Sequence, residues 1–429
     1  MHDNPDYLWF VEHTARELDI ACLIKYLMQK QHGKEIQIVS LPYSGYFEIF
    51  NINPEIIMVP YCYSFSSFSH ILPHYRKIKL LNLAYEQIFQ NINLDLKSPK
   101  DDFTKKYVIH HAWSEDFKKY QQNFGVNPKN IFVNGNLSYG LYKKPYMNFF
   151  MKKNEISKKF GLNPDHTWIL IPENYGAAFY TESIIQEKIS NGININDVID
   201  YKNFAQESLK ILIKWCIKAC DDKSVEIIFR PRPATPTSKM VEYFKSESSI
   251  LPKNLHITKD YSVREWILAS DVVMSSYSTT LIEAAVAEKP IYMLAPIVFP
   301  PYLHADWYNL VPQVTCYHEF LEIIRAFSPD SCLKLKQWTE SKYLKNGDPV
   351  QGIVRLLLKI PDIEIWASDN PELKKTIPEN EGNILSNIVK TIGVSFRKPK
   401  MEDYENDFFT PQDVLRKKME WERILNNII

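Results

Sequence analysis

A run of hydroxyl side chains follows a short apolar stretch in the second half of the chain. The run contains Ser275, Ser276, Ser278, Thr279 and Thr280. It comes after Asp271–Met274, which has the pattern of a buried strand, and it leads into a helix expected over about Thr280–Ala287. Unpaired N–H groups and the dipole of a helix start favour a phosphate, so the run predicts phosphate binding. Thr280 and Glu283 also have the spacing of a capping box, which needs no ligand.

Two arginines alternate with two prolines after another expected strand, Val225–Phe229. The sequence there is Arg230-Pro231-Arg232-Pro233. Proline stiffens the backbone and removes an N–H donor, and a guanidinium held in place suits bidentate contact with phosphate or carboxylate. We expect at least one of the two arginines to face a ligand. The alternation suggests that they point in opposite directions, and pairing with a surface acid is the alternative.

Three further side chains are candidates for acid–base chemistry. Glu173 follows the expected strand Trp168–Ile171, and Glu86 and His111 follow strand ends in the first third of the chain. A carboxylate or imidazole that projects into a cleft is what proton transfer to or from a hydroxyl acceptor requires. Glu173 could act as acid, base or nucleophile, or serve only as a turn carboxylate. Gly176, in the same loop, indicates a close approach of the backbone.

The remaining chemistry-bearing residues have simpler interpretations. His13, His110 and His111 lack a fourth ligand at a defined spacing, so we expect no metal site there. Cys216 and Cys220 share a helical face without a second ligand pair, which is typical of buried thiols. Glu17 is expected to stabilise the start of its helix.

Composition restricts the classes of protein to be considered. The chain has 429 residues, 51 Lys and Arg against 51 Asp and Glu, and 45% hydrophobic residues. This length predicts two or three domains, zero net charge argues against a nucleic-acid binder, and the apolar content argues against disorder. No glycine-rich phosphate loop is present, and neither a secretory signal nor a membrane-spanning run is found. We therefore expect a cytoplasmic globular enzyme.

Strands alternate with helices twice along the chain. In the first series the expected strands are Leu8–Val11, Glu35–Leu41, Glu55–Val59, Lys79–Leu83, Lys106–Ile109 and Ile131–Val133, with helices at Ala15–Lys30 and Ser114–Phe124. In the second series they are Trp168–Ile171, Val225–Phe229, Asp271–Met274 and Ile291–Leu294, with helices at Tyr201–Ala219 and Thr280–Ala287. Alternation of this kind predicts parallel sheets covered by helices. Ligands bind beyond the carboxyl ends of such strands.

We therefore predict an α/β fold of two Rossmann-like domains facing across a cleft. The expected boundaries are 1–150 for an acceptor domain, 151–345 for a nucleotide-sugar donor domain and 346–429 for a helical C-terminal segment. This last segment ends in an amphipathic helix over Pro411–Ile428, which could pack back across the first domain.

Taken in order, these stretches resemble the GT-B glycosyltransferases, in particular bacterial surface-carbohydrate (capsule and lipopolysaccharide) biosynthesis proteins. The similar segments are Asn82–Gln87, Lys106–Trp113, Val133–Asn136, Pro172–Gly176 and Ser275–Glu283. Arg230-Pro231-Arg232-Pro233 stands where related transferases that use CMP-activated sugars often carry a His-Pro pair. Glu288-Lys289-Pro290 stands where many GT-B chains have Gly-Lys-Pro. The Asp-x-Asp metal motif of GT-A enzymes is not found, which is consistent with metal-independent transfer.

The resemblance implies transfer of an acidic keto-sugar (Kdo or a nonulosonic acid) from a CMP-linked donor to a surface polysaccharide or glycolipid. No cofactor besides the donor and no nucleic acid is implied. Arg230 or Arg232, the hydroxyl run and Glu283 would hold the donor, while Glu86, Glu173 or His111 would act in catalysis. The alternatives are a CDP-glycerol-type polyol-phosphate transferase and a non-catalytic component of a polysaccharide assembly complex. Contact with the inner membrane face is possible through Arg397–Lys400 or the last helix, although a solvated charged face also explains those residues.

Overall fold

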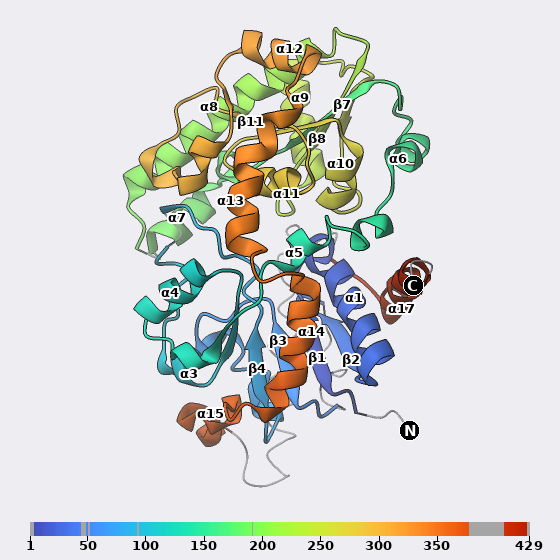
Figure 1. The fold of residues 1–429 in the computed structure, drawn as a ribbon. Coiled ribbons are helices and arrows are strands. Elements are labelled where there is room, and N and C mark those ends of the chain that lie inside the picture. The colour runs from blue at the N-terminus through green and yellow to red at the C-terminus, as the bar shows by residue number, and fades with distance from the viewer. Residues whose placement is uncertain are drawn as a thin grey trace. The chain divides into compact units, whose positions relative to one another are not determined.

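The computed structural model describes residues 4–43, 49, 52–91, 94–190, 192–376 and 407–426 (Figure 1). It consists of two compact units. The first comprises Met1–Phe149 and Glu340–Ile429, and the second comprises Phe150–Thr339. We describe each unit by itself.

The first unit is built on a six-stranded sheet with the order β2-β1-β3-β4-β5-β6. The strands are β1 (Tyr7–Val11), β2 (Ile36–Ser40), β3 (Ile56–Val59), β4 (Lys79–Asn82), β5 (Ile109–Ala112) and β6 (Ile131–Val133). Every neighbouring pair is parallel. All five residues of β1 are buried, as expected for a strand covered on both faces.

Helices from both ends of the chain surround this sheet. They are α1 (Thr14–His32), α3 (Asp102–Lys106), α4 (Glu115–Asn123), α5 (Leu137–Gly140), α14 (Pro349–Lys359), α15 (Pro371–Thr376) and α17 (Pro411–Asn426). In Figure 1, α14 lies against the sheet and α17 lies beside α1. The chain enters this C-terminal part through α13 (Leu333–Tyr343), which begins in the second unit.

Buried hydrogen bonds attach α14 to the sheet. The Tyr7 hydroxyl donates to the Leu357 carbonyl at 3.1 Å. The ammonium group of Lys79 is fully buried, donates to the Ile360 carbonyl at 3.0 Å and lies 4.1 Å from the centre of the Trp366 ring. The described part of the predicted segment 346–429 is therefore joined to the first unit and does not stand as a separate third part.

The second unit is built on a second parallel sheet with the order β12-β11-β10-β7-β8-β9. Its strands are β7 (Thr167–Pro172), β8 (Val225–Arg230), β9 (Leu255–Ile257), β10 (Val272–Ser275), β11 (Ile291–Leu294) and β12 (Gln313–Val314). Its helices are α6 (Lys153–Phe160), α7 (Glu182–Ser190), α8 (Ile195–Ala219), α9 (Thr237–Glu247), α10 (Val263–Ala269), α11 (Thr280–Val286) and α12 (Tyr317–Arg325). The predicted fold of two Rossmann-like α/β domains with a C-terminal helix is confirmed.

Most predicted elements lie within a few residues of their observed bounds, but the strand expected at Lys106–Ile109 is wrong. Residues Asp102–Lys106 form helix α3, and the Asp101 carboxylate caps its start by accepting the Thr104 N–H at 3.0 Å. The strand begins at Ile109 and contains His110 and His111. These histidines therefore lie inside the strand and not beyond its end.

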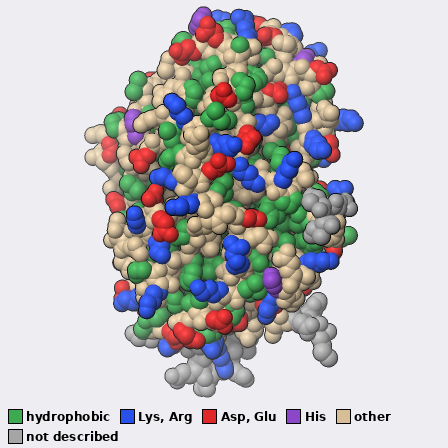
Figure 2. Space-filling view, viewed as in Figure 1, with side chains coloured by type: hydrophobic (Ala, Val, Ile, Leu, Met, Phe, Trp, Pro, Cys, Tyr) green, Lys and Arg blue, Asp and Glu red, His purple; other side chains and the backbone are tan. Residues whose placement is uncertain are grey.

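The described helices and the face shown in Figure 2 can be compared with the classes of protein that the composition excludes. Among the described helices, none combines the length and apolar character needed to cross a membrane. On the face shown in Figure 2, basic and acidic side chains are interspersed. Cys216 and Cys220 are buried free thiols, as predicted.

Both histidines of β5 are fully buried, and burial lowers the pKa of each from 6.5 to about 4. His110 is held by the Thr104 carbonyl at 2.8 Å from Nε2, with the Asn82 amide 3.2 Å from Nδ1. His111 Nδ1 lies 3.3 Å from the Leu83 carbonyl oxygen. Each ring is therefore neutral in the folded protein at physiological pH.

This burial predicts a loss of stability in acid. The folded-state pKa lies below the unfolded value of 6.5, so between pH 6.5 and about 4 the unfolded chain binds protons that the folded chain does not. The free energy of unfolding should therefore fall as pH falls, by up to about 3 kcal/mol for each histidine at pH 4. Urea unfolding at pH 7.5, 6.0, 5.0 and 4.5 measures the slope.

His111→Gln should flatten this pH dependence, whatever it does to stability at pH 7.5. The matched control is His318→Gln, because the His318 side chain is 80% exposed on α12. An equal slope for wild type and His111→Gln would contradict the assignment.

Candidate functional site

Each sheet has one point at which the strand order changes direction. The chain passes from β1 to β2 on one side of β1 and then returns to place β3 on the other side. In the second sheet β7 lies between β8 and β10 in the same way. Connections that leave in opposite directions open a crevice beyond the carboxyl ends of the two strands, where ligands of such sheets bind. The topology therefore marks one candidate ligand site in each unit.

A pocket of about 220 Å³ lies at the first of these points. It is lined by Glu12, Arg16, Pro60, Tyr61, Tyr63, Tyr85, Glu86 and Lys97. Glu12 follows β1, Pro60 follows β3 and Glu86 follows β4, so the carboxyl ends of three strands supply its walls. The rings of Tyr61 and Tyr63 are stacked with centres 5.7 Å apart. The pocket thus combines aromatic surface with charged groups of both signs.

The arginine of this pocket is held by one buried and one partly exposed acid. Arg16 Nη2 lies 2.5 Å from the Glu17 carboxylate and 3.0 Å from the Glu12 carboxylate. Glu17 is fully buried and also accepts the Glu12 N–H at 2.8 Å, which agrees with its predicted role at the helix start. Burial raises the pKa of Glu17, while Arg16 acts to lower it. The guanidinium is therefore fixed in direction, 5.4 Å from the centre of the Tyr85 ring.

Glu86 is the accessible carboxylate of the pocket. Its side chain is 48% exposed, forms an ion pair with Lys97 and lies 3.5 Å from Arg16 Nη1. The backbone before it is unusual: Ala84 has a φ of 47°, a left-handed conformation that is costly for a residue with a side chain. The Asn82 side chain accepts the Ala84 N–H at 3.0 Å and stabilises this turn. A carboxylate placed in this way can accept a proton from a hydroxyl group in the pocket.

His111 does not join this pocket. The prediction that it follows a strand end is wrong, and its ring is fully buried within β5. We therefore give it no part in the chemistry proposed below.

At the second switch point, the hydroxyl run begins with a buried link between β10 and β7. The Ser275 hydroxyl donates to the Pro172 carbonyl at 2.5 Å. Ser276 is only 2% exposed, and its hydroxyl adjoins that of Tyr175. Ser275 thus holds the two strand ends together, and Ser276 is the first residue after the carboxyl end of β10.

The rest of the run enters α11 without the capping box that the sequence suggests. Thr279 is the N-cap residue and its side chain makes no capping hydrogen bond. The Ser278 hydroxyl instead donates to the Thr280 hydroxyl at 3.0 Å. Glu283 lies in the first turn of α11.

The two arginines after β8 have different surroundings. Arg230 is 8% exposed and donates to the carbonyls of Lys259, Asp260 and Tyr261 at 2.9, 2.9 and 2.5 Å. Its guanidinium therefore supports the loop after β9. Arg232 is exposed, so it is the arginine of the pair that remains available to a ligand in the proposal below.

Gly176 explains where Arg232 lies. A Cβ added to Gly176 would come within 2.1 Å of Arg232 Nη1. The missing side chain therefore makes room for the guanidinium against the loop after β7, next to the switch point. This is the close approach that the sequence indicated for Gly176.

Glu173 connects the loops after β7 and β8. It is 5% exposed, and its carboxylate accepts the N–H groups of Tyr175 and Arg232, the latter at 3.3 Å. Burial raises the pKa of Glu173, against the lowering effect of Arg232. This geometry corresponds to the turn carboxylate among the predicted alternatives, because both oxygens bind backbone.

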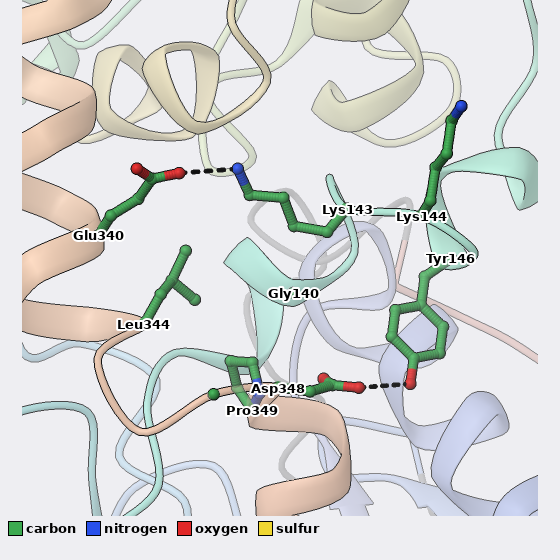
Figure 3. Close-up of a pocket in the computed structure, with 9 residues that line it drawn as sticks. Gly140, Lys143, Lys144, Tyr146, Glu340, Leu344, Asp348 and Pro349 are labelled. Carbon is green, nitrogen blue, oxygen red and sulfur yellow. Dashed lines mark hydrogen bonds and ion pairs between the residues drawn. The ribbon is translucent and has the colours of Figure 1, made fainter.

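A larger pocket of about 360 Å³ in the first unit contains none of the predicted site residues (Figure 3). Both of its carboxylates bind side chains of the same pocket: Lys143 lies 2.9 Å from Glu340, and the Tyr146 hydroxyl donates to Asp348 at 2.7 Å. Lys144 points away from these pairs in Figure 3. We therefore do not assign the chemistry to this pocket. Within the described ranges, no cluster of three or more His, Cys, Asp or Glu side chains could hold a metal ion.

Comparisons with known proteins identify the fold. No protein-family model matches the chain, and no curated protein matches it. A solved structure of the wall teichoic acid polymerase TagF aligns with a TM-score of 0.55 and 11% identity, covering 84% of this chain and 90% of that one. A TagF variant soaked with CDPG aligns with a TM-score of 0.55 and 11% identity, covering 84% and 89%. At this identity the likeness establishes the fold alone: the chain has the two-domain α/β architecture of GT-B proteins.

The role of Glu173 can be tested by stability. Glu173→Ala removes the acceptor of two backbone N–H groups, one of them buried, and should lower the free energy of unfolding by about 2 kcal/mol. Glu173→Gln keeps one acceptor oxygen and should cost less. Glu182→Ala, at an exposed position of α7, is the control. A Glu173→Ala protein as stable as this control would contradict the structural role.

Proposed function

We propose that this protein is a cytoplasmic, metal-independent glycosyltransferase. It moves an acidic keto-sugar of the Kdo or nonulosonic acid kind from a CMP-linked donor to a bacterial surface polysaccharide or glycolipid. The observation that carries the proposal is the pocket at the first switch point, where an accessible carboxylate faces two cations and three tyrosine rings. The GT-B architecture and the hydroxyl run at the second switch point support it.

The donor would bind in the second unit. As the glycosidic bond breaks, negative charge grows on the leaving phosphate, and donors fixed in advance stabilise that charge. Arg232 and the hydroxyls of Ser276, Ser278, Thr279 and Thr280 are the groups we assign to this role. Arg232 could instead hold the carboxylate of the sugar. Glu283 would contact the ribose hydroxyls.

The acceptor would bind in the first unit, in the pocket that contains Glu86. Sugar rings present apolar faces to aromatic side chains and hydroxyls to charged groups, and the pocket offers both. Glu86 would remove the proton of the attacking hydroxyl in an inverting reaction. In a retaining reaction the same carboxylate could act as nucleophile. Because Glu173 is bound to backbone, Glu86 is the carboxylate we favour.

A CDP-glycerol-type polyol-phosphate transferase is the second candidate. The likeness in fold to a wall teichoic acid polymerase, one of whose variants was soaked with CDPG, favours it. Product mass separates the two reactions, because the polyol-phosphate transferase adds a phosphodiester and the glycosyltransferase adds a sugar. Contact with the inner membrane face stays a proposal for either reaction.

Nucleotide binding tests the donor assignment. CMP should raise the melting temperature more than CDP, UDP or GDP, because a ligand that binds only the folded state stabilises it. Arg232→Ala should weaken CMP binding by about tenfold, since charge-assisted contacts are the stronger hydrogen bonds. Calorimetric titration measures this, with Arg325→Ala on α12 as a control for loss of an exposed arginine. A shift with CDP alone would favour the second candidate, and no shift with any nucleotide would contradict both.

Glu86→Gln should lower kcat by at least about a hundredfold while CMP affinity stays unchanged, because general base catalysis contributes factors of this size. The control is Glu55→Gln. The Glu55 side chain is 47% exposed, against 48% for Glu86, but it precedes β3 at the amino end of the strand. A Glu86→Gln enzyme with wild-type turnover would exclude Glu86 as the base.

A further inference from the structure

The C-terminal segment returns to the start of the first helix. Asp407 is 6% exposed although it lies 394 residues from His13. Its Oδ1 accepts the Thr14 N–H at 2.7 Å and the Thr14 hydroxyl at 2.9 Å. Its Oδ2 lies 2.8 Å from His13 Nδ1. One carboxylate thus binds three groups of His13 and Thr14. We call residues 12–14, which join β1 to α1, the β1–α1 turn.

These contacts supply what α1 does not supply locally. His13 is the N-cap residue, and its side chain makes no capping hydrogen bond. Helices usually begin with a Ser, Thr, Asp or Asn whose oxygen accepts an N–H of the first turn. Here Asp407 accepts such an N–H from the far end of the sequence. The negative charge is also favourable beside the positive end of the helix dipole.

The same turn forms one side of the pocket at the first switch point. Glu12 precedes His13, and Arg16 lies in the first turn of α1. Both line the pocket, and both belong to the ion-pair cluster that contacts Glu86. A displacement of the turn would therefore move the charged groups around the carboxylate that we propose as the base.

Helix α17 follows Asp407 in the chain and packs along α1 (Figure 1). Trp421 is fully buried, donates from Nε1 to the Asp19 carbonyl at 2.9 Å and stacks on Phe149 with ring centres 3.9 Å apart. Lys417 forms an ion pair with the Asp19 carboxylate at 2.5 Å. The segment thus contacts α1 through Asp407 at its start and again through Lys417 and Trp421.

We propose that Asp407 is a positioning residue for the pocket: from the C-terminal segment it fixes the β1–α1 turn, so that Glu12 and Arg16 keep Glu86 in its working arrangement. Its effect on turnover rests on the proposed function. Its effect on the turn does not.

The test uses the full chain and two measurements. Asp407→Asn keeps the shape of the side chain and removes its charge. Native-state hydrogen exchange should become roughly fivefold to tenfold faster at the amides of residues 14–17, the effect expected from loss of a cap. Release of CMP from CMP-Kdo, with water as acceptor, should fall in kcat by a similar factor while KM for the donor and affinity for CMP stay unchanged.

Two further variants separate positioning from general loss of stability. Asp413→Asn removes the carboxylate that binds Thr410 at the start of α17. It should change neither hydrogen exchange at residues 14–17 nor kcat. His13→Ser in the Asp407→Asn background gives α1 a local cap and should restore most of the lost protection and turnover.

The proposal is overturned if exchange at residues 14–17 is the same in Asp407→Asn and Asp413→Asn. It is also overturned if exchange rises equally throughout the first unit, or if the turn loosens while kcat of an active enzyme stays unchanged. A wild-type protein that neither binds nor releases CMP contradicts the proposed transferase instead. The exchange experiment and its rescue then decide whether Asp407 fixes the turn.

Discussion

Both candidate sites depend on one constraint: the first strand of each sheet lies between two parallel strands that the chain adds in opposite directions. β1 is the first strand of its sheet and β7 the first of the other, and each lies between strands added in opposite directions. The connections at such a strand leave in opposite directions, so a crevice opens beyond its carboxyl end. The charged pocket of the first unit and the hydroxyl run of the second both lie at these ends. Their chemistry follows from the loops, but their positions follow from strand order.

The order of strands and helices could be predicted because the signals are local. Apolar runs such as Ile291–Leu294 coincide with the observed strand, and α1 and α4 lie within two residues of their expected bounds. The pattern of apolar residues predicts the wrong element where a side-chain cap starts a helix. The Asp101 cap turns residues 102–106 into a helix, and this moves the following strand onto His110 and His111.

The composition of the candidate site was harder to predict, because it depends on contacts between distant segments. The sequence identifies Glu86, Glu173 and both arginines as candidates, but only the structure shows which of them are already bound to backbone groups. Glu86 is open to solvent, whereas Glu173 binds two backbone N–H groups and Arg230 binds three carbonyls. Arg16 and Lys97 were missed as pocket residues. The neighbouring Arg16-Glu17 pair at the start of α1 is the sequence feature that indicates charged groups there. Nothing in the sequence near α1 indicates that Asp407 caps the same helix.

The left-handed conformation of Ala84 affects how firmly the main chain before Glu86 is held. A residue at this φ is retained by its surroundings, here by the Asn82 side chain and by Gln87, whose amide donates to the Ala84 carbonyl at 2.9 Å. The main chain that carries Glu86 is thus secured independently of the side-chain ion pairs. Loss of the Lys97 ion pair alone would therefore leave the main-chain hydrogen bonds of this loop in place.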